Sequence, residues 1–360
     1  MGEVKRRTLY FTAPGKVELR EEVLPRPGAD EVLVETIYSA ISAGTEMLVY
    51  RGQFPHITDS HDSLSSNLNY PTTYGYACVG VIRETGELVD KSLLDKPVFG
   101  FQPHLTHFIA RVSSLIFVPD SFSADNIPPG EACCFLPNME TAVNLVQDAA
   151  PILGERALVI GQGVVGLLVA SLLREFPLET LITSDCYAIR RKASLELGAD
   201  DSFEPDSDNT KDIEIPLKNN VKETKSTSIS HFVYAHKFDL TFELSGSPSA
   251  LNDAIALTTF SGRIVIGSWY GEKKAQIDLG STFHRSRIKL ISSQVSTIAP
   301  ELSGRWDKSR RFGVAWDALK RIQPQKWITH RFPIEEAEKA YQLLDKNPEE
   351  TIQVLFDYSE

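Results

Sequence analysis

The stretch that decides the fold reads Ala157-Leu-Val-Ile-Gly161-Gln-Gly163-Val-Val-Gly166 and continues as Leu167-Leu-Val-Ala-Ser-Leu-Leu. An apolar run enters three glycines in G-x-G-x-x-G spacing and a second apolar run leaves them, which predicts a strand, a tight turn and a helix. Gly161 permits the turn, Gly163 lets backbone amides approach a pyrophosphate, and Gly166 lets the helix pack on the strand. We therefore expect a dinucleotide at the helix N-terminus, where N–H groups and the helix dipole favour phosphate.

An acidic residue follows the glycine turn at the spacing that is typical of dinucleotide-binding motifs. Asp185 ends the next apolar run, Thr180-Leu-Ile-Thr-Ser, 24 residues after Gly161. A carboxylate at that strand end accepts hydrogen bonds from the adenosine ribose and repels a 2′-phosphate. It favours NAD(H), while the nearby Arg190 and Arg191 leave NADP(H) possible. The alternative is a glycine-rich turn of some other α/β protein, against which the strand, helix and acid argue together.

Length, charge and cysteine spacing exclude several classes of protein. The 360 residues predict two domains or slightly more, and 42% apolar residues suffice for ordinary cores. A net charge of −11 argues against nucleic-acid and anionic-membrane partners. The four cysteines lack C-x-x-C spacing, so they predict neither a disulfide framework nor a four-cysteine zinc site. Without a signal-peptide core or a long enough apolar stretch, we expect a soluble, cytoplasmic protein.

The sequence changes character along the chain. Short alternating runs between Gly, Pro and Asn turns extend to about residue 119, and strands then alternate with helical patterns as in parallel βαβ units. The terminal strand, residues 351–356, suits the first module better, so the expected division is 1–128, an inserted domain at 129–296, and 297–360. Residues 55–70 are a polar loop, either a lid or a surface insertion without a role. Residues 204–225 form a second loop.

Further motifs carry a family resemblance over nearly the whole chain. They are Ile41-Ser-Ala-Gly-Thr-Glu46, Tyr74-Gly-Tyr-Ala-Cys-Val-Gly80, Gly198-Ala-Asp200, Phe238-Asp-Leu-Thr-Phe-Glu-Leu-Ser-Gly246 and Gly262-Arg-Ile-Val-Ile-Gly267. With the glycine turn and Asp185, they resemble the medium-chain dehydrogenase/reductase superfamily. The resemblance implies an α/β fold in which a Rossmann domain with a doubly wound parallel sheet is inserted into a GroES-like β-barrel catalytic domain, with substrate bound between them.

The resemblance also shows where the chain departs from zinc-dependent members. Ala43 stands where those members have a zinc cysteine, Tyr76 where they have a zinc histidine, and Pro137 near a further ligand position. Ala77 replaces the acid beside that histidine, and the lobe with four closely spaced cysteines is absent. Alanine, tyrosine and proline do not make the three-ligand site of a catalytic zinc. We therefore expect a zinc-independent member without a metal site.

Without zinc, hydrogen-bond donors must stabilise the alkoxide or enolate of a hydride transfer. Thr45 occupies the position whose hydroxyl touches the reacting oxygen in zinc-dependent relatives, and Tyr76 places a phenol where the metal histidine stood. We expect Thr45 to bind the oxygen and Tyr76 to relay the proton. The alternatives are a turn cap for Thr45 and a packed barrel aromatic for Tyr76. His104 and His107 are weaker candidates for a metal or a proton relay.

The glycine turn and the resemblance together predict the cofactor contacts. Residues 267–269 follow a strand at the end where the nicotinamide lies in this superfamily, and Trp269 either lines that pocket or packs between domains. Ser245 and Gly246 are expected along the adenosine side. The predicted set is Gly161, Gln162, Gly163, Val164, Val165, Gly166, Asp185, Arg190, Ser245, Gly246, Gly267, Ser268 and Trp269.

Two short segments narrow the resemblance to a branch. Residues 42–46 and 283–294 are most similar to the branch that includes the bacteriochlorophyllide hydroxyethyl dehydrogenases, which oxidise a secondary alcohol. We expect hydride transfer between NAD(H) and a small secondary alcohol or its ketone. The alternatives are an NAD(P)H-dependent quinone or enone reductase, and a nicotinamide-binding structural or regulatory protein without essential turnover. Residues 288–295 resemble the edge strand through which relatives dimerise, which favours a homodimer.

Overall fold

The computed structural model describes residues 4–54, 68–122, 130–205 and 237–358. The chain forms two compact units, one of residues 1–137 and 316–360 and the other of residues 138–315. The sequence analysis places the divisions at 128/129 and 296/297. Most of the expected loop 55–70 and nearly all of the loop 204–225 lie outside the described residues. Among the described helices, none combines the length and the apolar character that crossing a bilayer requires.

The first unit is β-rich. Its larger sheet has the order β14-β15-β3-β4-β5-β7, with β6 pairing β3, and β1 and β2 form an antiparallel pair of their own. The strands are β1 Val4–Ala13, β2 Lys16–Leu24, β3 Glu31–Ile41, β4 Cys78–Thr85, β5 Pro97–Gly100, β6 His107–Arg111, β7 Ile116–Phe117, β14 Ile328–Pro333 and β15 Gln353–Asp357. Apolar side chains of β3, β4 and β5 are buried on one another, including Val32, Ile82 and Val98.

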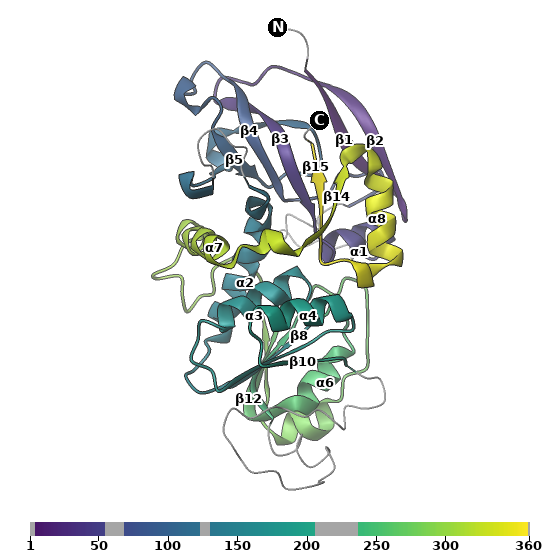
Figure 1. Cartoon of the computed structure of the whole chain (residues 1–360), viewed down its shortest axis with the longest axis vertical. Coiled ribbons are helices and arrows are strands. Elements are labelled where there is room, and N and C mark those ends of the chain that lie inside the picture. The colour runs from purple at the N-terminus through teal and green to yellow at the C-terminus, as the bar shows by residue number, and fades with distance from the viewer. Residues whose placement is uncertain (1–3, 55–67, 123–129, 206–236, 359–360) are drawn as a thin grey trace. The chain divides into compact units, whose positions relative to one another are not determined.

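The C-terminal segment returns to this first unit. Strand β15 pairs antiparallel with β3, with Val354 opposite Ile41, as the sequence predicted for the terminal strand. Figure 1 shows β15, in yellow, beside the purple β3. Helix α8 (Ala337–Lys346) lies against β2, and helix α1 (Thr45–Arg51) follows directly after β3. The residues 42–46 are therefore held by a paired strand on one side and a helix on the other.

The second unit contains a six-stranded parallel sheet of order β10-β9-β8-β11-β12-β13. Its strands are β8 Arg156–Ile160, β9 Thr180–Ser184, β10 Asp201–Phe203, β11 Phe238–Glu243, β12 Thr258–Ile266 and β13 Lys289–Ser292. The helices that begin in or belong to this unit are α2 Leu136–Ala149, α3 Val164–Leu173, α4 Ala188–Glu196, α6 Ala250–Leu257 and α7 Lys308–Ile322. Figure 1 shows α3 and α4 on one side of the sheet and α6 on the other.

The strand order places a ligand site in the second unit. From β8 the chain proceeds through α3, β9 and α4 toward β10, whereas from β11 it proceeds through α6 toward β12 on the other side of β8. Open α/β sheets bind their ligands at such a reversal, beyond the carboxyl ends of the strands. The glycine turn after β8 and the loop after β11 both lie at that point.

Candidate functional site

The glycine turn connects β8 to α3 with two glycines that the packing requires. Gly161 has φ +91°, and a Cβ built on it would lie 2.5 Å from the carbonyl oxygen of Leu244. A Cβ on Gly166 would lie 1.9 Å from the carbonyl oxygen of Gly161. Such distances are far inside van der Waals contact, so neither position accepts a side chain without moving the backbone. These two glycines explain how strand, turn and helix fit together.

Gly163 differs from its two neighbours in the motif. It caps the N-terminus of α3 with φ −64°, and a Cβ built on it meets no atom within 4 Å. Neither backbone geometry nor internal packing therefore demands glycine here. The space in front of the helix N-terminus is open, which suits a ligand that approaches the backbone closely.

Asp185 joins the end of β9 to the glycine turn. Its Oδ2 accepts a hydrogen bond from the backbone N–H of Gln162 at 2.7 Å, and its Oδ1 accepts one from the N–H of Tyr187 at 2.8 Å. The side chain of Gln162 is fully buried and donates to the carbonyls of Val159 and Gly161, both at 3.0 Å. The acid and the turn thus hold each other in place, although they are separated in the sequence.

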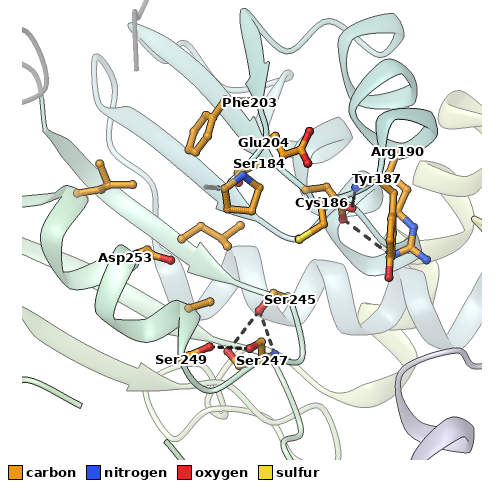
Figure 2. A pocket seen from close by; sticks show the side chains of 16 residues that line it. Ser184, Cys186, Tyr187, Arg190, Phe203, Glu204, Ser245, Ser247, Ser249 and Asp253 are labelled. Carbon is orange, nitrogen blue, oxygen red and sulfur yellow. Dashed lines mark hydrogen bonds and ion pairs between the residues drawn. The ribbon is translucent and has the colours of Figure 1, made fainter. Parts of the chain in front are cut away.

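A pocket of about 330 Å³ opens beside this contact, and Figure 2 shows its lining side chains. Four of the predicted cofactor residues line it: Gly161, Asp185, Arg190 and Ser245. The other lining residues are Ile160, Ser184, Cys186, Tyr187, Phe203, Glu204, Pro205, Ser247, Ser249, Ala250, Asp253 and Leu257. The predicted residues Gln162, Gly163, Val164, Val165, Gly166, Gly246, Gly267, Ser268 and Trp269 are not among its lining.

The two arginines after Asp185 have different surroundings. Arg191 donates to the carbonyls of Asp185 and Cys186, and it pairs with Glu204 at 2.9 Å. Arg190 lines the pocket, lies over the ring of Tyr187 and approaches Asp185 Oδ2 at 3.9 Å. Both arginines therefore contact the protein, and Arg190 also lines the pocket.

The predicted residues beyond β11 and β12 form a neighbouring group. The N–H of Gly246 donates to Ser268 Oγ at 2.9 Å, and a Cβ on Gly267 would lie 2.6 Å from Leu244 and 2.7 Å from Leu145. Trp269 is partly buried in the same segment. The group connects the ends of the two strands, and Gly267 is needed for its close packing.

A buried acid, missed by the sequence analysis, organises this group. Glu243 is fully buried and accepts hydrogen bonds from the N–H and hydroxyl of Ser245 and from the hydroxyl of Tyr270. Burial and the Glu243 carboxylate raise the pKa of Tyr270 above its ordinary value. Glu243 lies in one of the family-like motifs, but the sequence does not indicate which residues its carboxylate contacts.

In the first unit, the structure brings the two predicted catalytic residues together. Tyr76 Oη donates to Ser42 Oγ at 2.5 Å, and the backbone N–H of Thr45 reaches the same Ser42 oxygen at 3.5 Å. Burial raises the pKa of Tyr76, and side-chain hydrogen bonds from Ser42 and Thr45 oppose that shift. Ser42, Thr45 and Tyr76 therefore form one cluster of three hydroxyls, which we call the hydroxyl cluster. Ser42 lies in one of the family-like motifs, but the sequence pattern does not single it out as a site residue.

A network of buried hydrogen bonds lies next to the hydroxyl cluster. Glu46 is fully buried, and its Oε1 accepts the N–H of Ser42 at 2.8 Å. Its Oε2 lies 2.8 Å from His104 Nε2 and accepts the hydroxyl of Tyr341 at 2.7 Å. His104 is therefore an internal partner of an acid, whereas His107 contacts the hydroxyl of the adjacent Thr106.

The network extends from His104 to the C-terminal segment. With Glu46 as a carboxylate, Nε2 of His104 donates to it and Nδ1 accepts from Ser39 Oγ, 2.7 Å away. Ser39 Oγ in turn contacts the Tyr358 hydroxyl at 2.8 Å. This order gives every buried hydroxyl and nitrogen in the row a partner, which is what burial of polar groups requires.

The residues at the zinc-ligand positions do not fit zinc. Ala43 and Pro137 carry no side-chain ligand atom, and the hydroxyl of Tyr76 is hydrogen-bonded to Ser42. Within the part of the chain that the structure describes, no three His, Cys, Asp or Glu side chains are grouped so that they would hold a metal ion. Of the cysteines, Cys78, Cys133 and Cys134 are buried and free, and Cys186 is exposed and free.

Known proteins of similar sequence and structure match nearly the whole chain. No family model matches. The starvation-sensing protein RspB of Escherichia coli K12 is 22% identical over 383 residues, covering 98% of this chain and 100% of that protein. The L-threonine 3-dehydrogenase of Xanthomonas euvesicatoria pv. vesicatoria is 21% identical over 359 residues, covering 91% and 93%. The structure of an alcohol dehydrogenase, rspB, of E. coli CFT073 with NADH superposes with a TM-score of 0.73 at 18% identity, covering 98% and 99%.

The solved structure aligns with almost the whole of this chain, including both units, and this alignment identifies the fold. The chain is a dehydrogenase-type enzyme with the medium-chain alcohol dehydrogenase fold. The expected α/β architecture, a GroES-like catalytic domain with an inserted Rossmann domain, is confirmed. Two further solved structures that superpose on this chain, from Sinorhizobium meliloti 1021 and Clostridium scindens ATCC 35704, are named as putative zinc-binding dehydrogenases.

Proposed function

We propose that the chain is a zinc-independent, nicotinamide-dependent oxidoreductase that transfers hydride between NAD(H) and a small secondary alcohol or its ketone. The observation that carries the proposal is the 2.7 Å contact of Asp185 with the glycine turn, which lies beside a pocket at the strand-order reversal. The L-threonine 3-dehydrogenase relative is named for oxidation of a secondary alcohol, which supports that substrate class.

The residues of the second unit fit a dinucleotide. The open space at Gly163 and the N-terminus of α3 would take the pyrophosphate, and Asp185 would take the adenosine ribose. The relative's structure contains NADH. The bound nicotinamide would supply the hydride acceptor or donor, and the group formed by Gly246, Gly267, Ser268 and Trp269 would lie toward it.

Asp185 supports a preference for NAD(H) over NADP(H). Its carboxylate is held at the pocket wall and would repel a 2′-phosphate, whereas Arg190 faces the same space and would attract one. NADH should bind more tightly to the wild type than NADPH in a fluorescence titration. Asp185→Asn should narrow that difference and Arg190→Ala should widen it, with Asp200→Asn as a control for an acid bonded to backbone outside the pocket. Tighter NADPH binding by the wild type would overturn the assignment.

The hydroxyl cluster would do the work that zinc does in the relatives. When an alcohol is oxidised, its carbinol C–H bond supplies the hydride and its O–H proton must leave. Thr45 would hold the oxygen, and Tyr76 would take up the proton while passing its own to Ser42 along their 2.5 Å hydrogen bond. Ser42, which is partly exposed, would release its own hydroxyl proton to solvent. In ketone reduction the same donors would stabilise the developing alkoxide. Neutral hydroxyls suit this role because each both donates and accepts.

A homodimer belongs to the same proposal. Strand β13 ends the parallel sheet, and three of its four residues are exposed, so its outer edge has unpaired backbone groups among the described residues. Pairing of two such edges would continue the sheet. Light scattering coupled to gel filtration tests this: a mass near 80 kDa, twice the 40.0 kDa chain, is expected, and a stable monomer would contradict it.

The proposed reaction is tested by a screen for NAD(H)-linked turnover. Secondary alcohols with NAD⁺, and ketones, quinones and enones with NADH, should be compared under one set of conditions. Turnover of secondary alcohols or ketones is expected. Turnover confined to quinones or enones would instead support the reductase alternative. NADH binding without any turnover would support a regulatory role, the class to which the name of the RspB relative points.

A further inference from the structure

Asp253, on helix α6, lines the same pocket as Asp185. In Figure 2 it lies on the side of the pocket opposite Tyr187 and Arg190. The lining around the pocket is mixed, but Phe203, Pro205, Ala250 and Leu257 give it an apolar part. Apolar side chains donate no hydrogen bonds, so they do not offset the cost of removing the Asp253 carboxylate from water.

The three acidic residues that line the pocket differ in the hydrogen-bond and ion-pair partners of their carboxylates. Asp185 accepts two backbone N–H groups, and Glu204 pairs with Arg191 at 2.9 Å. Among the described residues, no hydrogen bond or ion pair is found for the carboxylate of Asp253, and burial raises the pKa of its carboxyl. A half-buried carboxylate without donors destabilises the protein that carries it, unless a ligand brings the donor.

The proposed dinucleotide brings such a donor. With its ribose at Asp185, the adenosine base extends along the pocket toward α6, and its flat faces meet the apolar lining. Adenine has a single strong donor on its edge, the 6-amino group, which carries two N–H bonds. Hypoxanthine has an oxygen at that position, which a carboxylate repels.

We propose that Asp253 accepts a hydrogen bond from the 6-amino group of adenine and makes the pocket selective for adenine dinucleotides over their hypoxanthine analogues. This inference rests on the proposed dinucleotide function, and it assigns recognition of the base to a residue separate from those that bind ribose and pyrophosphate. The carboxylate thus contributes specificity at the cost of leaving one group unsatisfied in the empty pocket.

Calorimetric titration with NADH and with reduced nicotinamide hypoxanthine dinucleotide tests the proposal on the full chain. The wild type should bind NADH about tenfold more tightly, as expected for one hydrogen bond to a charged group. Asp253→Ala should bind both ligands with nearly equal affinity. Asp253→Asn should also lose most of the preference, because its amide can turn an N–H toward the hypoxanthine oxygen. Glu196→Ala removes an exposed acid of α4 outside the pocket and should keep the wild-type preference.

The outcomes separate this inference from the function on which it rests. Failure of both dinucleotides to bind the wild type would refute the dinucleotide site itself. Equal binding of both by the wild type, or a preference that survives in Asp253→Ala, would refute the role of Asp253 while leaving the site intact. Thermal unfolding of the empty variants completes the test, since Asp253→Ala should be at least as stable as the wild type. A marked loss of stability would show that Asp253 is a structural residue.

Discussion

Glu46 and His104 form a fully buried pair, with 2.8 Å between Oε2 and Nε2. The same carboxylate holds the N–H of Ser42, so the pair fixes the backbone from which Ser42 and Thr45 project. The hydroxyl cluster is therefore positioned by an internal network of buried hydrogen bonds. This relationship explains how a site of small hydroxyl groups keeps its geometry.

Removing His104 should destabilise the protein markedly. His104→Ala leaves Glu46 with one donor fewer and Ser39 without its nitrogen partner, and each buried polar group left unsatisfied costs about 1–3 kcal/mol. Urea unfolding should show this loss. His107→Ala, which removes a partly buried histidine three residues away, is the control and should cost less than about 1 kcal/mol. Equal effects of the two variants would argue against the network.

The hydroxyl cluster should control the rate rather than cofactor binding. Thr45→Ala and Tyr76→Phe should each lower kcat/KM by about 100-fold, the usual effect of losing one oxyanion or proton-transfer group. Their affinity for NADH should stay close to that of the wild type, because the cofactor residues lie in the other unit. Steady-state kinetics and a binding titration on each variant make the comparison. Full turnover in both variants would assign the residues to the turn-cap and packing alternatives.

Gly163 and Gly166 should respond differently to alanine. Gly163→Ala adds a methyl group in open space at an ordinary φ, so the protein should fold normally while its affinity for NADH falls by at least about tenfold. Gly166→Ala would force a methyl group against the Gly161 carbonyl and should lower the melting temperature. Thermal unfolding and NADH titration distinguish the two effects. Unchanged NADH binding by Gly163→Ala would contradict the pyrophosphate assignment.

Alkaline pH should destabilise the folded chain. Burial, with the Glu46 carboxylate as the next cause, raises the pKa of Tyr341, and burial also raises that of Tyr358. Below about pH 10, the ordinary tyrosine value, both phenols are protonated whether the chain is folded or unfolded. Above it, the unfolded chain releases these protons first, so stability falls by up to about 1.4 kcal/mol per pH unit for each tyrosine.

The melting temperature measured from pH 8 to 11 checks this dependence. It should fall increasingly steeply above pH 10 in the wild type. Tyr358→Phe removes one of the titrating groups and should reduce that slope. Tyr10→Phe, a change at a partly exposed tyrosine in the β1–β2 pair, should reduce it less. A slope that is the same in all three proteins would show that the buried phenols are not its cause.

Local patterns were sufficient for the Rossmann unit. Gly161, Gly166 and Asp185 lie in one strand–turn–helix–strand segment, so their spacing determines how they meet. The return of the terminal strand to the first module also followed from the order of elements. Both features follow from residue spacing and from the order of elements, which can be read from a single sequence.

The partners of the catalytic candidates depend on long-range register instead. Ser42 meets Tyr76 from 34 residues away, and Glu46 meets Tyr341 from 295 residues away. No sequence motif marks Asp253, because its pocket is made by segments that no local pattern connects. Contacts of this kind appear once the sheet is assembled.

The proposed hydride transfer proceeds without zinc, through the hydroxyl cluster. The most direct measurement is NAD(H)-linked turnover of a secondary alcohol or ketone by protein stripped of metal with a strong chelator, with its metal content determined on the same sample. We predict full activity at much less than one zinc per chain and no gain when zinc is restored. Activity that disappears with the metal and returns with stoichiometric zinc would contradict the account.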